Sequence, residues 1–237
     1  MNPNIITPLL VKACQELDRS MQSSLDGTKL QSIKETISNY AIAAAVASAV
    51  AGVVPGVAGV VAALTQAGFV WATYVKINKT LGISMSKNTA KFIGSAIVTN
   101  LVTSGGAFLL SYAGATVLSF IPVVGQAAAV AIDAALGYII IYVAALIYLR
   151  LITRAMRPDG TLKIDASDDT KRIIKEIIKG SNIKEMVKEG KNAYQAAKDS
   201  GEIEKAKKAL TCPHCKKAMI QPWQKFCSKC GGVLKVN

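Results

Sequence analysis

Two long stretches without charged side chains limit what this chain can fold into. Residues 41–75 carry no charge, and residues 92–149 carry a single one, at Asp133. A helix that crosses a bilayer needs about 20 largely apolar residues. The first stretch is therefore long enough for two short helices, and the second for two full ones.

Each uncharged stretch has a natural break at a proline. Pro55 is followed directly by Gly56, and Pro122 lies shortly before Gly125. Proline clashes with the preceding helical turn and lacks a backbone donor, so each break predicts a hairpin turn with a new helix after it. The predicted helices cover residues 29–53, 55–80, 86–119 and 122–156.

The two hairpins show signs of a weak internal repeat. The prolines are 67 residues apart, and the same offset aligns Gln66 with Asp133. A coincidence of Ala-rich composition is the alternative. A carboxylate inside an apolar helix is costly unless it faces a polar group or a cavity. We therefore expect Gln66 and Asp133 to form a polar pair that fixes the packing of the hairpins, with an ion or proton site as the alternative.

The placement of lysine and arginine predicts an orientation in a membrane. Positive residues lie before the first hairpin, between the hairpins and after the second, whereas neither proline has a charge nearby. The positive-inside rule then predicts four spans with both termini cytoplasmic. Because alanine is nearly neutral for insertion, shallow re-entrant hairpins, or a water-soluble bundle that inserts conditionally, are alternatives. Small residues along the helices allow close approach of backbones, and we expect a homo-oligomer in the lipid bilayer.

Residues 1–28 predict one amphipathic helix. Thr7 is suited to an N-cap, and Pro8 to the first helical position. We expect this helix to dock on the next domain, with an interfacial membrane helix as the alternative. Cys14 lies on its apolar face, where a buried and unreactive thiol is expected. The first residues lack the pattern of a signal peptide.

Residues 157–210 predict a basic helical connector. Isoleucines recur at helical spacing within residues 171–179, lysines fill the other face, and Gly180 predicts the end of that helix. A second helix is predicted from Ile183 to Gly190, and a third, highly charged helix follows. Such helices can lie on an anionic leaflet or pack on a neighbour, and the sequence favours neither.

Four cysteines near the C-terminus form the most specific motif. Cys212 and Cys215 make one CxxC pair, and Cys227 and Cys230 make a second after 11 intervening residues. Two such pairs, which form turns known as knuckles, place four thiolates around one tetrahedral ion. We predict structural Zn²⁺ in a zinc ribbon over residues 211–237, with a redox pair or an iron site as the competing hypothesis.

The predicted zinc site also constrains location and partners. Zinc-binding thiolates must stay reduced, which predicts a cytoplasmic tail and agrees with the charge-based topology. His214 is the only histidine, and we expect no ligand role for it because the cysteines already complete the site. Lysines and Trp223 could serve nucleic-acid or protein docking. Acidic residues interrupt the positive run of the connector, so nucleic acid is not an expected partner.

Part of the chain resembles a known group of proteins. The segments VVPGVAGVVAALTQAGFVWATYVKINKTLGISMSKNTAK and FIPVVGQAAAVAIDAALGYIIIYVAALI, joined by a Gly-rich helix, resemble a poorly characterised bacterial hydrophobic helical domain of unknown function, often associated with Era-like GTPases. The resemblance covers about residues 48–150. It implies a membrane-associated helical domain and a GTPase as a candidate partner, which would be a separate protein because this chain has no GxxxxGK[ST]. CPHC and FCSKCG resemble zinc-ribbon modules of bacterial membrane proteins.

These observations predict an all-α membrane domain of two helical hairpins with Pro/Gly turns, plus a small C-terminal zinc ribbon. The expected domains are residues 1–28, 29–156, 157–210 and 211–237. We expect a non-enzymatic scaffold, or a self-assembling or membrane-remodelling protein, in the bacterial inner membrane, because the sequence offers no nucleophile with a base and no acid/base pair. An oligomeric channel or pore, and a membrane-tethered module that binds nucleic acid or a GTPase, are the alternatives.

Overall fold

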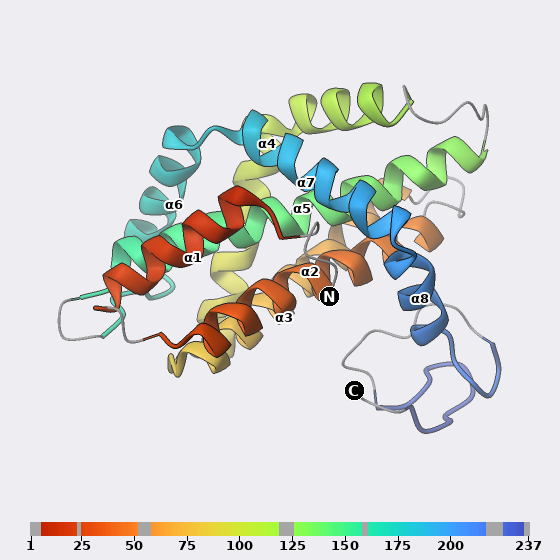
Figure 1. The fold of residues 1–237 in the computed structure, drawn as a ribbon, viewed down its shortest axis with the longest axis horizontal. Helices are drawn as coiled ribbons and strands as arrows, with labels where there is room; N and C mark the ends of the chain where they lie inside the picture. The colour runs from red at the N-terminus through yellow and green to blue at the C-terminus, as the bar shows by residue number, and fades with distance from the viewer. Residues whose placement is uncertain are drawn as a thin grey trace.

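The computed structural model describes residues 6–22, 25–51, 58–118, 126–157, 161–216 and 225–234, and the side chains of residues 50–66, 102 and 104–129 fall outside that description. Within these ranges the chain forms eight helices, and its only β-structure is two isolated bridges (Figure 1). The helices are α1 (Pro8–Ser20), α2 (Gly27–Ala51), α3 (Ala58–Leu81), α4 (Lys87–Leu118), α5 (Gln126–Ala155), α6 (Asp168–Gly180), α7 (Ile183–Asp199) and α8 (Glu202–Ala209). The prediction of an all-α chain with four long helices is confirmed.

Helix α5 is the centre of the fold. It lies in the middle of the helices in Figure 1 and contacts α1, α2, α3, α4, α6 and α7. Its residues from Tyr138 to Ile152 are almost all buried. Val130–Ala155 is the one described segment that is long and apolar enough to cross a bilayer, with a mean hydropathy of 2.3, and 67% of its most apolar window is buried by protein. A core helix has the same composition as a membrane span, so this segment alone does not distinguish the two.

Tyrosines between α3 and α5 supply both packing and hydrogen bonds to this core. The rings of Tyr74 and Tyr148 stack with their centroids 3.8 Å apart. The Tyr74 hydroxyl donates to the carbonyl oxygen of Ala144 at 2.9 Å, and the Tyr148 hydroxyl donates to Oδ1 of Asn78 at 2.7 Å. A buried hydroxyl is costly unless it has a partner, so these bonds fix the register of α3 against α5.

Helix α1 docks on α5 through its apolar face, as the sequence predicts. Leu10, Cys14 and Leu17 are at most 1% exposed. The Thr7 side chain caps the helix by accepting from the backbone N–H of Leu10. Burial raises the pKa of the Cys14 thiol to about 11, with a smaller lowering by Lys34, so the thiol is neutral at physiological pH.

A buried polar cluster joins α1, α5 and α7. The hydroxyls of Thr7 and Tyr142 hydrogen-bond to each other. Oε2 of Glu189, on α7, accepts from the Tyr142 hydroxyl at 3.2 Å and from the backbone N–H of Leu9 at 3.0 Å. The carboxylate thereby satisfies a free donor in the first turn of α1, where negative charge is favoured. We call Thr7, Tyr142 and Glu189 the polar latch.

Helices α6 and α7 cover α4 and α5 rather than extending away from them. Ile174, Ile177 and Ile178 of α6 are 0–8% exposed, and α6 contacts α4 and α5. Of the two arrangements that the sequence allowed for these helices, the structure has the one in which they pack on neighbours.

Helix α6 begins at Asp168. The Lys171 ammonium lowers the pKa of the Asp168 carboxyl through a hydrogen bond and through its positive charge.

The predicted end of the second connector helix at Gly190 is wrong, because α7 continues to Asp199. Gly190 lies against α5, where a Cβ atom would stand 2.9 Å from Cδ1 of Tyr142. The glycine therefore permits a close approach of two helices and does not end α7. A glycine that serves packing cannot be told from a glycine that ends a helix by sequence alone.

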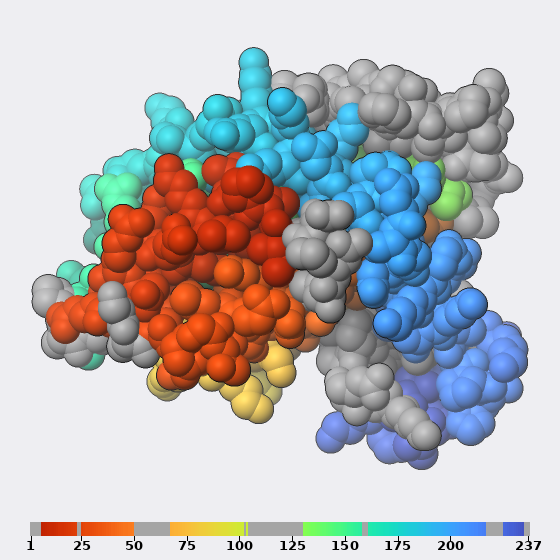
Figure 2. Space-filling view, viewed as in Figure 1, coloured from red at the N-terminus to blue at the C-terminus, as the bar shows by residue number. Residues whose placement is uncertain are grey.

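Large apolar side chains are scarce on the described surface. Among residues whose side chains are described, the exposed ones are Val75, Phe226 and Val233, at 38%, 60% and 68%. Helices α1, α6, α7 and α8 lie on the face that Figure 2 shows, and many of their exposed residues are charged or polar.

The predicted turns at Pro55 and Pro122 lie outside the described residues, but the helices that flank them can be followed. Helices α2 and α4 end beside these turns, and α3 and α5 begin there. In Figure 1 these four helix ends lie at one end of the molecule, opposite the end where α2 begins and α5 ends. We call it the hairpin end. In Figure 1, helix α8, which packs on α2 and α7, and the described residues after it lie on the same side of the molecule as the hairpin end.

Candidate metal centre

The four cysteines belong to a small segment that α8 attaches to the body. The described part of this segment, residues 211–216 and 225–234, is called the cysteine module below. Leu210 is buried after the last turn of α8, and the Thr211 hydroxyl donates to the carbonyl oxygen of Lys207 at 2.8 Å. The chain thus leaves α8 in a fixed direction and enters the first CxxC pair directly.

The two CxxC pairs have the same backbone structure. The N–H of Lys216 donates to the carbonyl of Cys212 at 3.0 Å, and the N–H of Gly231 donates to the carbonyl of Cys227 at 2.8 Å. Lys216 and Gly231 have φ angles of +57° and +69°. The position after each second cysteine is therefore left-handed, which glycine adopts freely and lysine at some cost. Sequence analysis did not anticipate that Lys216 takes this role.

The second pair is held in a short hairpin. Phe226 and Val233 form an antiparallel bridge, and the N–H of Cys227 donates to the carbonyl of Gly232 at 2.9 Å. A further bond joins the N–H of Leu234 to the carbonyl of Lys225 at 2.8 Å. These bonds present Cys227 and Cys230 toward the first pair.

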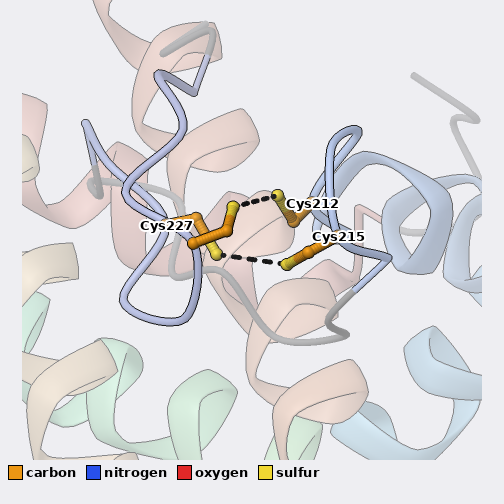
Figure 3. A group of neighbouring side chains, drawn as sticks. Cys212, Cys215 and Cys227 are labelled. Carbon is orange, nitrogen blue, oxygen red and sulfur yellow. Dashed lines mark hydrogen bonds between the residues drawn. The ribbon is translucent and has the colours of Figure 1, made fainter.

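The four sulfur atoms converge on one point, and all lie within 4.8 Å of one another (Figure 3). Sγ of Cys212 is 3.8 Å from Sγ of Cys230, and Sγ of Cys215 is 3.6 Å from Sγ of Cys227. These separations are too long for disulfides, and all four thiols are free. A tetrahedral ion with metal–sulfur bonds of about 2.3 Å needs sulfur atoms about 3.8 Å apart, so the residues fit such an ion.

Backbone amides favour thiolates at this centre. The N–H groups of Cys230 and Lys229 lower the pKa of Cys227 to about 6, and the Lys229 nitrogen is 3.4 Å from that sulfur. Backbone N–H groups, that of Cys215 first, also lower the pKa of Cys212. The N–H of Gly232 acts in the same direction on Cys230, but desolvation and the neighbouring thiols raise its pKa to about 11. A cation among the sulfur atoms would stabilise the Cys230 thiolate against these effects.

His214 joins the two cysteine pairs without being a member of the cluster. Its Nε2 atom lies 3.3 Å from the carbonyl oxygen of Val233, to which the Nε2–H tautomer donates. A Cβ atom at Gly232 would stand 2.5 Å from Cδ2 of the imidazole, so the ring packs directly on the glycine backbone. Sequence reasoning assigned this histidine no role. The glycine pair after CSKC was the available signal for a close approach.

The two members of the predicted polar pair, Gln66 and Asp133, lie on neighbouring helices. Asp133 is half-buried on α5, and Gln66 lies on α3, which contacts α5. The Gln66 side chain lies outside the described residues, so the pairing stays a prediction.

Comparisons with known proteins give no relative for this chain. No family model matches it, and neither do any of the curated proteins or solved structures searched. The resemblance of residues 48–150 to the bacterial hydrophobic helical domain therefore stays an expectation.

Proposed function

We propose that the protein is a non-enzymatic scaffold that attaches to a membrane through the hairpin end of its helical bundle and carries a structural zinc module beside that end. The observation that carries this proposal is the meeting of four helix ends at one end of the molecule (Figure 1). Residues 41–75 and 92–132, which include both predicted turns, contain no charged side chain.

The physical argument is the free-energy cost of leaving uncharged, apolar hairpins in water wherever the protein itself does not cover them. Each buried Å² of apolar surface is worth roughly 25 cal/mol, and a bilayer removes that surface from water without a protein partner. Uncharged helical hairpins with Pro/Gly turns suit this medium because their backbone donors and acceptors are satisfied internally. Attachment by the hairpin end also leaves both chain termini on the same side of the membrane.

The helices that cover α5 favour shallow insertion of the hairpins rather than four complete membrane spans. Helices α1, α6 and α7 cover α5, and their outer faces carry the charged residues. The polar latch binds α1 and α7 to α5 at Tyr142. Lipid contact along the whole of α5 would require these helices to leave, so re-entrant hairpins are the form we propose.

We further propose that the metal of the cysteine module is zinc. Four soft thiolate ligands in two knuckles suit Zn²⁺, and four protein ligands leave no open position for substrate or water. The ion would hold the two knuckles together, and the module would need a reducing compartment such as the cytoplasm.

Vesicle flotation of the purified full-length chain tests the attachment. Neutral phosphatidylcholine vesicles should carry the wild type, while the double variant Val54→Asp, Val123→Asp should bind at least about 100-fold more weakly, since one Asp at depth costs about 3 kcal/mol. The matched control is Thr28→Asp, Ser84→Asp, which adds the same charge at two exposed positions of the opposite end. Equal binding by the two double variants, or no binding by the wild type, would refute attachment through the hairpin end.

A further inference from the structure

The cysteine module has a surface that neither the metal centre nor the body uses. Phe226 and Val233 are 60% and 68% exposed, and they are the two most exposed large apolar residues of the described chain. They are opposite each other in an antiparallel bridge, so their side chains stand on the same face of the hairpin. Exposed aromatic and β-branched side chains side by side indicate a contact surface.

The segment that carries this pair has charge of one sign. Residues 205–237 contain eight lysines and no acidic residue. Four thiolates on one Zn²⁺ leave a charge of −2, so the side chains and ion of this segment together carry +6. Lys208, Lys225 and Lys229 are exposed. The partner of such a surface must offer negative charge together with an apolar layer that accepts Phe226.

We infer that this face of the cysteine module docks on anionic lipid headgroups of the membrane that the hairpin end enters. The inference rests on the proposed function and assigns its lipid preference. In Figure 1 the module lies on the same side of the molecule as the hairpin end, and α8, which leads into it, packs on α2. A headgroup layer supplies negative charge at the surface and apolar chains beneath it, which matches a lysine-rich segment with an exposed Phe/Val pair. A nucleic acid would match the charge equally but is not brought close by the hairpins.

The lysines set the expected change in affinity for anionic vesicles. Each lysine near an anionic surface contributes about fivefold in affinity, so removal of three should weaken binding by on the order of 100-fold. Insertion of Phe226 should add about tenfold. The lysine contribution should fall with ionic strength, whereas that of Phe226 should not.

The test compares full-length, zinc-loaded proteins on two kinds of vesicle. One is phosphatidylcholine alone, and in the other one third of the lipid is phosphatidylglycerol. The variant is Lys208→Gln, Lys225→Gln, Lys229→Gln, and the matched control, Lys175→Gln, Lys179→Gln, Lys188→Gln, removes three exposed lysines from α6 and α7. Zinc content is measured for each protein to show that the module is folded.

The wild type and the control should bind anionic vesicles more tightly than neutral ones by on the order of 100-fold. The variant without Lys208, Lys225 and Lys229 should lose that preference. Equal loss in both triple variants, or no preference in the wild type, would overturn the inference. So would binding of a single-stranded oligonucleotide that depends on Lys208, Lys225 and Lys229 while the lipid preference does not. Lysine-dependent binding to anionic vesicles without binding to neutral ones would support this inference and refute insertion of the hairpins, which separates the two proposals.

Discussion

Replacement of Gly190 by alanine is expected to destabilise the protein, although the same change in most helices stabilises them. Gly190 lies inside α7, where alanine is favoured over glycine by about 1 kcal/mol. The new methyl carbon would stand 2.9 Å from Cδ1 and 3.4 Å from Cγ of Tyr142. Tyr142 is 1% exposed, and its hydroxyl is held in the polar latch, so the ring cannot swing away.

Overpacking of a buried site costs about 1–3 kcal/mol. This cost exceeds the gain in helix propensity, so the free energy of unfolding should fall by about 1 kcal/mol. Urea unfolding followed by circular dichroism measures this change, with the m-value unchanged. Gly180→Ala is the matched control, because nothing lies within 4 Å of a Cβ atom there, and it should leave stability unchanged or raise it.

A double-mutant cycle isolates the cause. In a Tyr142→Leu background the ring is gone, so Gly190→Ala should become neutral or stabilising. If Gly190→Ala raised stability as much as Gly180→Ala does, or if its effect were the same in both backgrounds, α7 would not pack on α5 in solution. The argument that α7 covers α5 would then be refuted, and with it the case for shallow hairpins.

Three further outcomes are expected. Cys227→Ser should abolish stoichiometric zinc binding, measured by elemental analysis, while the helical circular dichroism of the body persists. The control Cys14→Ser should keep its zinc. Retention of zinc by Cys227→Ser would exclude the four-thiolate site. His214→Ala should keep one zinc per chain but release it faster to a chelator, because the bond to Val233 that joins the knuckles is lost; an unchanged release rate would contradict that role. Burial raises the pKa of Cys14 to about 11, so the stability that its neutral thiol contributes is full below pH 9 and is lost as pH rises toward 11. The dependence of unfolding on alkaline pH should therefore be weaker in Cys14→Ala. An unaltered dependence would count against burial of the thiol.

Local signals predicted the long helices well because their ends are set by residues with strong backbone preferences. Charged and turn-forming residues separate α3 from α4, and Gly180 ends α6, as predicted. The convergence of the four cysteines was equally predictable, since the spacing of two knuckles leaves few other geometries.

What the sequence did not predict depends on contacts between distant segments. The continuation of α7 past Gly190 is decided by Tyr142, which lies 48 residues earlier in the chain. The same holds for His214, whose partner Val233 is in the other knuckle. Glu189 looked like one of several surface acids in a basic connector, yet it binds both α1 and α5. Helical periodicity gives the buried face of a helix but not the identity of the surface that covers it.

The polar latch has a consequence for the order in which the chain is made. Thr7 and Tyr142 are available once α5 has been synthesised, but Glu189 and the rest of α7 come later, and α7 ends 44 residues after α5. At 5–20 residues per second, the ribosome leaves the apolar surface of α5 without α6 and α7 for roughly 2–9 s. During that interval α1 to α4 can cover α5, but the faces of α5 that α6 and α7 cover in the finished fold are left without them. Every newly made copy therefore passes through a state that chaperones or the bilayer can bind, before α7 closes over the core.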